Sequence, residues 1–132
     1  MKKSYFEVYY EMFNNEKTKA LRSNGIVLYS MMANQVGLSK RPENVKKYTD
    51  KNGEVFILFT ERNAKDKLGI SKKTFFELKK MLKELGLINY EKQAIKKNGV
   101  STPIYVTPLD VWLKSEYEKI QEDKKYDLPD FH

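Results

Sequence analysis

Cysteine is absent from the 132 residues, and the single histidine is the last residue, His132. The first absence excludes disulfides and thiolate metal sites. The second removes a histidine general base, a catalytic triad and a histidine zinc site. No apolar run approaches the roughly 20 residues of a membrane-spanning helix, and no glycine-rich loop ends in Lys-Ser or Lys-Thr to bind nucleotide phosphates. We therefore expect no enzyme activity, no metal, no cofactor and no membrane partner, and a cytoplasmic location.

Positive charge is concentrated in one part of the chain. The whole sequence has 25 Lys and Arg against 18 Asp and Glu, a net charge of +7. Residues 62–101 contain eleven Lys and Arg against four Asp and Glu, so their net charge of +7 equals that of the whole chain. The residues before this segment contribute +3 and the residues after it contribute −3. Because 40% of the residues are hydrophobic, the chain can form a core. We interpret the excess as a basic surface of a folded domain that binds nucleic acid.

Residues 60–86 predict a helix-turn-helix. Thr60 is the expected N-cap of the first helix, which Gly69 ends. Ser71 caps the second helix, which Gly86 ends. The turn between the two helices is only Gly69-Ile70, and so short a turn is typical of the helix-turn-helix motif.

Residues 87–107 predict a β-ribbon wing. Two strands are expected at 87–92 and 103–106, joined by a basic loop with Asn98-Gly99 at its tip. This order of elements belongs to the winged helix-turn-helix, which places its second helix in a DNA major groove. The expected fold class is therefore α+β, a winged helix-turn-helix with an extra N-terminal segment and a C-terminal helix.

The second helix of the motif has two faces at helical spacing. Its apolar sector, expected to face the core, consists of Phe75, Leu78, Leu82 and Leu85. The opposite sector consists of Lys72, Lys73, Phe76, Lys79, Lys80 and Lys83. Lysines in one exposed arc suit phosphates and guanine edges, and an exposed aromatic can contact a thymine methyl group. The alternative for Phe76 is that it lies half-buried under the wing.

These positions give a set of candidate DNA contacts. Base readout is expected from residues near the start of the helix: Lys72, Lys73, Thr74, Phe76, Glu77 and Lys80. Backbone contacts are expected from Lys79 and Lys83 and from Asn63 and Lys65 on the preceding helix. In the wing, Lys96, Lys97 and Asn98 are expected along a minor groove or on flanking phosphates. Two alternatives stay open. Glu77 can instead form a helical ion pair with Lys73 or Lys80, and the wing can be a solvated hairpin tip.

The N-terminal segment is rich in aromatic side chains. Read as a helix, residues 4–13 align Phe6, Tyr9, Tyr10 and Phe13 in one stripe. Such a stripe either packs on the core of its own chain or forms a dimerisation arm. The dimerisation candidates are Tyr5, Phe6, Tyr9, Tyr10 and Phe13, and we expect a homodimer.

Further elements complete the domain. A first core helix is expected over 23–35, with Ser23 as N-cap and Gly37 as its end, and a buried strand over 55–59. A last helix opens at Pro108. Its apolar stripe is expected to consist of Val111, Trp112, Ser115, Tyr117 and Ile120.

The loop and the tail have no assigned contacts. In the polar loop 38–53, Lys40, Arg41, Lys46 and Lys47 form a second basic cluster whose face stays open. Asp50 and Glu54 bracket a turn, and we expect a structural role for them. Residues 1–122 are expected to be one winged-helix domain and 123–132 an acidic, linker-like tail.

Part of the chain resembles a known family. The segments that carry the resemblance are Phe13, Leu21-Arg22-Ser23, Leu28-Tyr29, Leu38-Ser39, Tyr48-Thr49-Asp50-Lys51-Asn52-Gly53, Val55 to Thr60, the helix-turn-helix and Leu85-Gly86-Leu87-Ile88. They resemble the N-terminal domain of the RepA_N plasmid replication initiators of Gram-positive bacteria. The resemblance implies a dimeric winged-helix domain that binds repeated origin sites (iterons). It also implies that host replication proteins are engaged by a separate C-terminal domain, a missing domain to which the tail 123–132 is expected to lead.

Three functions fit these observations. The first is sequence-specific double-stranded DNA binding that initiates plasmid replication. The second is a transcriptional repressor of the same fold on a palindromic operator. The third is a winged-helix protein-interaction module, which the concentrated charge disfavours.

Overall fold

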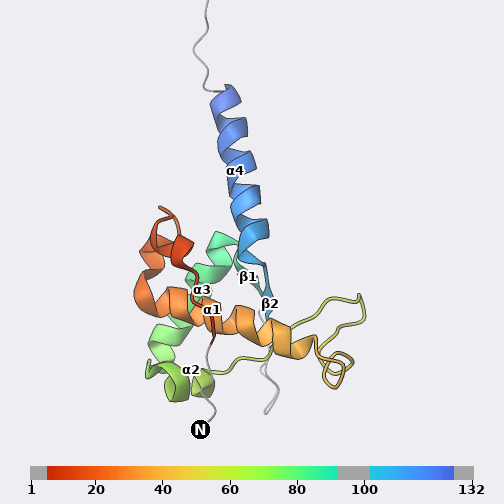
Figure 1. The fold of residues 1–132 in the computed structure, drawn as a ribbon. Coiled ribbons are helices and arrows are strands. Elements are labelled where there is room, and N and C mark those ends of the chain that lie inside the picture. Colours follow the sequence, from red (N-terminus) through yellow and green to blue (C-terminus); the bar gives the residue numbers. More distant parts are fainter. Residues whose placement is uncertain (1–5, 92–101, 127–132) are drawn as a thin grey trace, which may run out of the picture.

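The computed structural model describes residues 6–91 and 102–126 as helices around a small β-ribbon (Figure 1). The elements in chain order are η1 (Tyr10–Phe13), η2 (Lys19–Leu21), α1 (Arg22–Ser39), α2 (Glu61–Leu68), α3 (Lys72–Leu85), β1 (Ile88–Asn89), β2 (Tyr105–Val106) and α4 (Leu109–Tyr126). The two strands are antiparallel, with Ile88 opposite Val106 and Asn89 opposite Tyr105. Helix, turn, helix and ribbon therefore follow in the order of a winged helix.

Local signals place the helix-turn-helix where the sequence predicts it. Thr60 caps α2, and its hydroxyl accepts the backbone N–H of Asn63. Gly69, at φ 69°, ends α2 in the left-handed conformation. Ser71 caps α3 through the N–H of Thr74, and Gly86, at φ 84°, ends it. The predicted caps and ends of both helices are confirmed.

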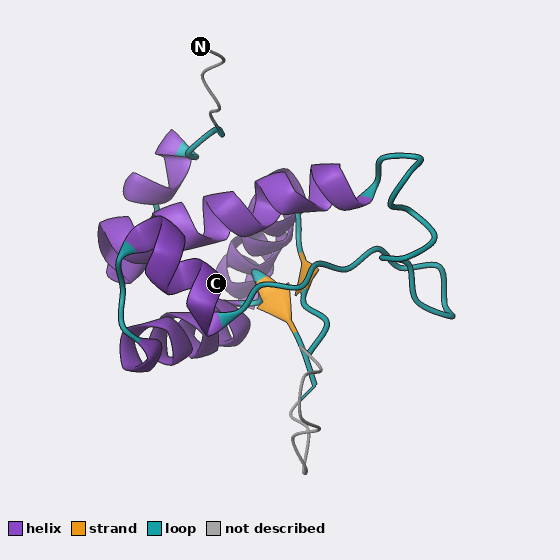
Figure 2. Ribbon diagram, turned by 90° about the horizontal axis from the view of Figure 1, so that it is seen from below, coloured by secondary structure: helices purple, strands orange, loops and turns teal. Residues whose placement is uncertain are grey.

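The core lies where α1 crosses α2 and α3 (Figure 2). Tyr29 of α1 is fully buried, and its hydroxyl donates to the carbonyl of Thr107 at 2.5 Å. Burial raises the pKa of the Tyr29 hydroxyl, so the group stays neutral. The α1 backbone approaches α3 closely at Gly25, because a Cβ there would lie 3.2 Å from Leu78. Helix α1 is thus fixed against both α3 and the segment that follows β2.

The bounds of α1 differ from those that the sequence predicts. The helix begins at Arg22 and ends at Ser39, so Ser23 lies in its first turn and caps nothing. Gly37 remains inside the helix because its φ is not positive, and Lys40 is the C-cap. A glycine marks a helix end only where the backbone turns left-handed. Arg22 has a φ of 59°, the sole positive value among the non-glycine residues of 6–91 and 102–126.

The N-terminal aromatic stripe is not a continuous helix. After an extended stretch the chain forms only the short η1, where Met12 is buried and Tyr10 is 74% exposed. Tyr9 packs at a tilt on Tyr29, with ring centroids 5.9 Å apart. Phe6 and Phe13 are only partly covered, and Tyr5 lies outside the described residues. The segment therefore packs on its own core through Tyr9 and Met12.

The predicted strand over 55–59 is an extended segment with isolated bridges. Ile57 pairs with Ile104, and Val55 with Thr49. Ile57 and Phe59 point inward and are buried, whereas Phe56 and Leu58 are partly exposed. The apolar run thus has one buried face and one partly exposed face, so the prediction of a buried strand was right only for Ile57 and Phe59.

Of the predicted apolar stripe of α4 only Trp112 is buried, and the other four positions were wrong. The buried side chains are Leu109, Trp112 and Glu116, whereas Tyr117 and Ile120 are exposed; Val111 and Ser115 are exposed as well. The reason is that α4 projects beyond the rest of the domain (Figure 1), so its outer turns have no core to cover them. No helix within residues 6–91 and 102–126 is long and apolar enough to span a lipid bilayer.

Candidate nucleic-acid interface

Helix α3 separates an apolar face from a basic face. Phe75, Leu78 and Leu82 are buried in the core, as predicted. The opposite face is exposed at Lys72, Lys73, Phe76, Glu77 and Lys80, and partly exposed at Lys79 and Lys83. The helix therefore presents five lysines and one aromatic ring on its outer face while its inner face anchors it.

Phe76 lies on the basic face and is 43% exposed. Its ring contacts that of the buried Phe75, with centroids 5.5 Å apart. The core therefore supports one edge of Phe76 while the rest of the ring stays accessible. A ring in this position can contact an apolar group of a ligand.

Tyr90, just after β1, organises two lysines of α3. The Nζ atoms of Lys79 and Lys83 lie 4.3 and 4.4 Å from the Tyr90 ring centroid, at the distance of cation–π contacts. Lys83 also donates a hydrogen bond to the Tyr90 carbonyl. The base of the ribbon thus holds two neighbouring ammonium groups side by side, although like charges at this helical spacing repel.

Tyr90 was not among the sequence candidates. The available signal was an aromatic residue directly after the expected start of the wing, but its lysine contacts depend on how the ribbon folds back on α3. Partial burial raises the pKa of the Tyr90 hydroxyl. Tyr90 thus stays an uncharged ring beside two cations.

The remaining candidates on α3 differ in their partners. Lys72 lies 3.6 Å from a carboxylate oxygen of Glu61, an atom that has no hydrogen-bond partner. Thr74 belongs to the helix cap, since its hydroxyl accepts from that of Ser71 at 3.0 Å. Within the described part of the chain, Glu77 forms no ion pair with Lys73 or Lys80. Lys73, Glu77 and Lys80 therefore remain open to a ligand.

The flanking candidates are only partly described. Asn63 completes the α2 cap, because its Oδ1 accepts from both the backbone N–H and the hydroxyl of Thr60 at 2.9 Å. Lys65 is exposed on the same helix. The candidates of the wing, Lys96, Lys97 and Asn98, lie outside the described residues.

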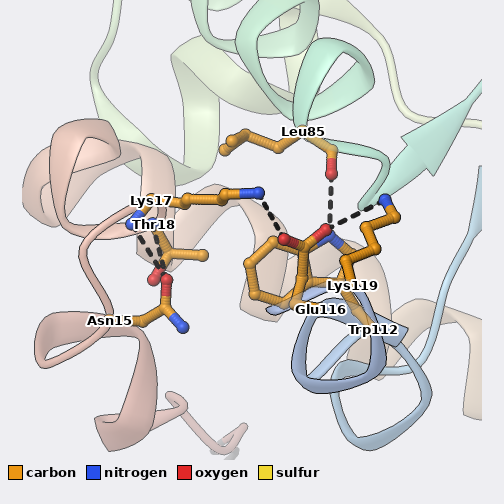
Figure 3. Close-up of polar contacts among 7 residues, drawn as sticks. All are labelled: Asn15, Lys17, Thr18, Leu85, Trp112, Glu116 and Lys119. Atoms are coloured by element: carbon orange, nitrogen blue, oxygen red, sulfur yellow. Dashed lines mark hydrogen bonds and ion pairs between the residues drawn. The ribbon is translucent and has the colours of Figure 1, made fainter. Parts of the chain in front are cut away.

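A polar cluster fixes α4 beside the end of α3 (Figure 3). The indole N–H of Trp112 donates to the carbonyl of Leu85 at 2.7 Å. One turn later the buried carboxylate of Glu116 pairs with Lys17 and, at 3.2 Å, with Lys119. The hydrogen bond from Lys17 is the main cause that lowers the pKa of Glu116. The N-terminal segment and α4 are thus joined next to the end of α3.

The site has the features of a binding surface. Within residues 6–91 and 102–126, no three Asp, Glu or His side chains gather in a way that could hold a metal ion. A cleft between the end of α1 and α2 is lined mostly by polar side chains, among them Gln35, Asn44 and Asn63. The chemistry that the basic face offers is attraction of anions and contact with apolar groups.

The fold and the basic second helix define a winged helix-turn-helix domain. Residues 4–121 match RepA_N, described as the N-terminus of replication initiator protein A, and the chain belongs to this family. The match confirms the resemblance seen in the sequence and extends it through the ribbon and most of α4. No curated protein matches the chain.

Solved structures share the fold. One described as "Structure of Rep-DNA complex" has a TM-score of 0.59 at 17% identity and covers 87% of each chain. One described as "N-Terminal domain of DNA binding protein" has a TM-score of 0.60 at 14% identity, over 90% of this chain and 88% of the other. One described as "Structure of MDR initiator" has a TM-score of 0.59 at 17% identity, over 87% and 89%. At these identities the similarity shows the fold.

Proposed function

We propose that this domain binds double-stranded DNA at repeated sites (iterons) in a plasmid origin and so initiates plasmid replication. The observation that carries the proposal is the outer face of α3, where five lysines and Phe76 are presented by a helix whose other face is buried. In a winged helix this is the element that enters the major groove. Membership of the RepA_N family and the likeness to structures described as a Rep–DNA complex and an initiator support it.

The basic face supplies two kinds of contact. Lys73, Glu77 and Lys80 are free to reach base edges, and Phe76 offers a ring to a thymine methyl group. Lys79 and Lys83, held beside Tyr90, neutralise phosphates. Phosphate contacts set the position of the domain, and base contacts select the sequence.

The test is fluorescence anisotropy of the protein on duplexes of its own plasmid origin and on scrambled duplexes, across a salt series. We expect origin binding to survive salt concentrations that abolish binding to the scrambled duplex. Equal, salt-labile binding to all duplexes contradicts an origin-specific function. A preference for a palindrome over direct repeats favours a repressor instead.

We further propose that the domain acts as a homodimer through its N-terminal aromatic segment. Tyr9 is used within the chain, but Val8 and Tyr10 are 42% and 74% exposed and Phe13 is 37% exposed. Apolar side chains that gather on a surface mark association sites. Light scattering with and without DNA tests this; a monomer at high concentration in both conditions contradicts it, and Tyr10→Ser should weaken a dimer that forms.

A further inference from the structure

The loop between α1 and the extended segment carries a second group of cations. Four exposed side chains, named here the loop cations, are Lys40, Arg41, Lys46 and Lys47. In the part of the chain that the structure describes, none of them pairs with a carboxylate. Their charge is therefore not neutralised by an acidic partner and attracts anions.

The loop is held against the second strand of the ribbon. One oxygen of Asp50 accepts the backbone N–H groups of Asn52 and Glu54 at 2.8 and 2.9 Å, and the other accepts the hydroxyl of Tyr105 in β2 at 2.7 Å. The Glu54 N–H and then the Tyr105 hydroxyl lower the pKa of Asp50. The same bond to Asp50 raises the pKa of Tyr105 to about 12. At neutral pH the acceptor is charged and the donor keeps its proton, so the link persists.

A row of aromatic rings makes the same connection. The Nζ of Lys47 lies 5.5 Å from the Tyr48 ring centroid. Tyr48 meets Phe56 edge-on at 6.0 Å, and Phe56 meets Tyr105 at 6.1 Å. One loop cation is thus positioned relative to β2 through three ring contacts. Figure 1 shows the loop beyond the end of α1 and far from the free end of α4.

The two basic groups of the molecule are attached to the two strands of one ribbon. The lysines of α3 reach β1 through Tyr90, which follows that strand directly. The loop that carries the second group reaches β2 through the bond between Asp50 and Tyr105, and Lys47 reaches it through the ring contacts. Because β1 and β2 pair side by side, the ribbon lies between two sets of cations. A linear polyanion that contacts α3 can continue past the ribbon to the loop.

We propose that the loop cations contact DNA phosphates on the far side of the ribbon from α3, which lengthens the footprint of the domain along the duplex. The inference rests on the duplex binding proposed above. Phosphate contacts carry no sequence information. The loop therefore raises affinity for every duplex and leaves the preference for the origin unchanged.

The test compares charge-matched variants on both origin and scrambled duplexes across a salt series. Lys46→Gln/Lys47→Gln and Arg41→Gln/Lys46→Gln each remove two loop cations. Lys19→Gln/Lys114→Gln removes two exposed cations from η2 and α4, outside both basic groups. Circular dichroism melts verify that all three variants stay folded.

Each phosphate contact that is lost lowers the slope of log affinity against log salt by about 1. We therefore expect each loop variant to lower that slope by about 2, and the affinity near 0.1 M salt by at least about tenfold. The control should keep the wild-type slope. Removing the base pairs that the loop covers should abolish the difference between the loop variants and the wild type, because those base pairs carry the extra phosphates.

The outcomes are separable. The loop contact is contradicted if both loop variants keep the wild-type salt slope. It is also contradicted if the control variant shows an equal decrease, because the effect would then come from the net charge of the protein alone. Equal affinity of the wild type for origin and scrambled duplexes contradicts the proposed origin function. The slopes still decide the loop contact in that case, because phosphate contacts do not depend on sequence.

Discussion

Trp112 of α4 donates its indole N–H to the carbonyl of Leu85 at 2.7 Å, which joins α4 to the last turn of α3. The carbonyls of a final helical turn lack partners within their own helix. The Trp112 ring is buried against the core and also lies about a van der Waals contact from the position of a Cβ at Gly86. The orientation of α4 is therefore set directly at the point where α3 ends.

The first prediction concerns acid pH at the adjacent carboxylate. Its partner Lys17 lowers the pKa of Glu116 from the ordinary value of 4.5. A carboxylate with a depressed folded-state pKa adds stability above its unfolded value, and this is lost as pH falls through the folded value. We expect α4 to loosen below about pH 4.5, and Trp112, the only tryptophan, to report it by a red shift of fluorescence.

Glu116→Gln provides the control for this titration. The variant removes the charge, so its fluorescence at neutral pH should already show part of the red shift and should change less on acidification. A wild-type emission that stays constant from pH 7 to pH 3, with the fold intact by circular dichroism, would contradict a role of this ion pair in docking α4.

The helix-turn-helix could be predicted because its signals are local. Thr60 and Ser71 cap their helices through residues three positions away, and Gly69 and Gly86 turn left-handed at the ends. In α4, by contrast, the buried face depends on distant partners. Glu116 is buried because Lys17, 99 positions earlier, lies against it. A hydrophobic pattern gives no sign of a buried carboxylate, so the predicted stripe failed there.

In the candidate site, too, the local features could be predicted from the sequence and the contacts with distant residues could not. The lysine face of α3 follows from helical spacing alone, and the structure places it outward. The contacts of Tyr90 with the lysines could not be predicted, because they depend on how the ribbon folds back on α3. The sequence also does not show whether the amide of Asn63 caps α2 or contacts a ligand, and in the structure it caps α2. Residue type indicated the chemistry of the surface, whereas the partners of each side chain came from packing.

The second prediction uses two glycines of α1 that differ in their surroundings. A Cβ at Gly25 would lie 2.7 Å from the Cβ of Leu21, whereas a Cβ at Gly37 meets nothing within 4 Å. We expect Gly25→Ala to destabilise the domain by roughly 1–3 kcal/mol through overpacking. Gly37→Ala should stabilise it by about 0.5–1 kcal/mol, because alanine is the better helix former. Urea unfolding followed by circular dichroism measures both.

Opposite signs are the decisive outcome for this pair. If Gly37→Ala destabilised the protein, Gly37 would end the helix, as the sequence alone suggested. If Gly25→Ala left the free energy of unfolding unchanged, the space between α1, α3 and η2 would be large enough for a methyl group at position 25.

The third prediction concerns Tyr90 as a positioning residue. Tyr90→Phe keeps the ring beside Lys79 and Lys83 and should bind DNA as the wild type does. Tyr90→Leu keeps an apolar side chain but loses the cation–π contacts, and we expect about a threefold to tenfold lower affinity. The control readout is the NMR shift of the lysine ε-methylene protons, which the ring should move upfield only in the wild type and the Phe variant. Equal affinities of the Leu and Phe variants would contradict the role.

The fourth prediction separates base readout from phosphate contact. Phe76 is exposed on the outer face of α3 and Lys73 is free of ion pairs within the described residues, so both can reach base edges. Phe76→Ala and Lys73→Ala should reduce the preference for origin over scrambled duplexes by about fivefold or more, since a good base contact contributes roughly 1–3 kcal/mol of discrimination. Lys65→Ala on α2 should instead weaken both duplexes alike and lower the salt slope by about 1. Uniform losses from all three variants would mean that α3 does not select the sequence, and the preference would then have to come from DNA shape.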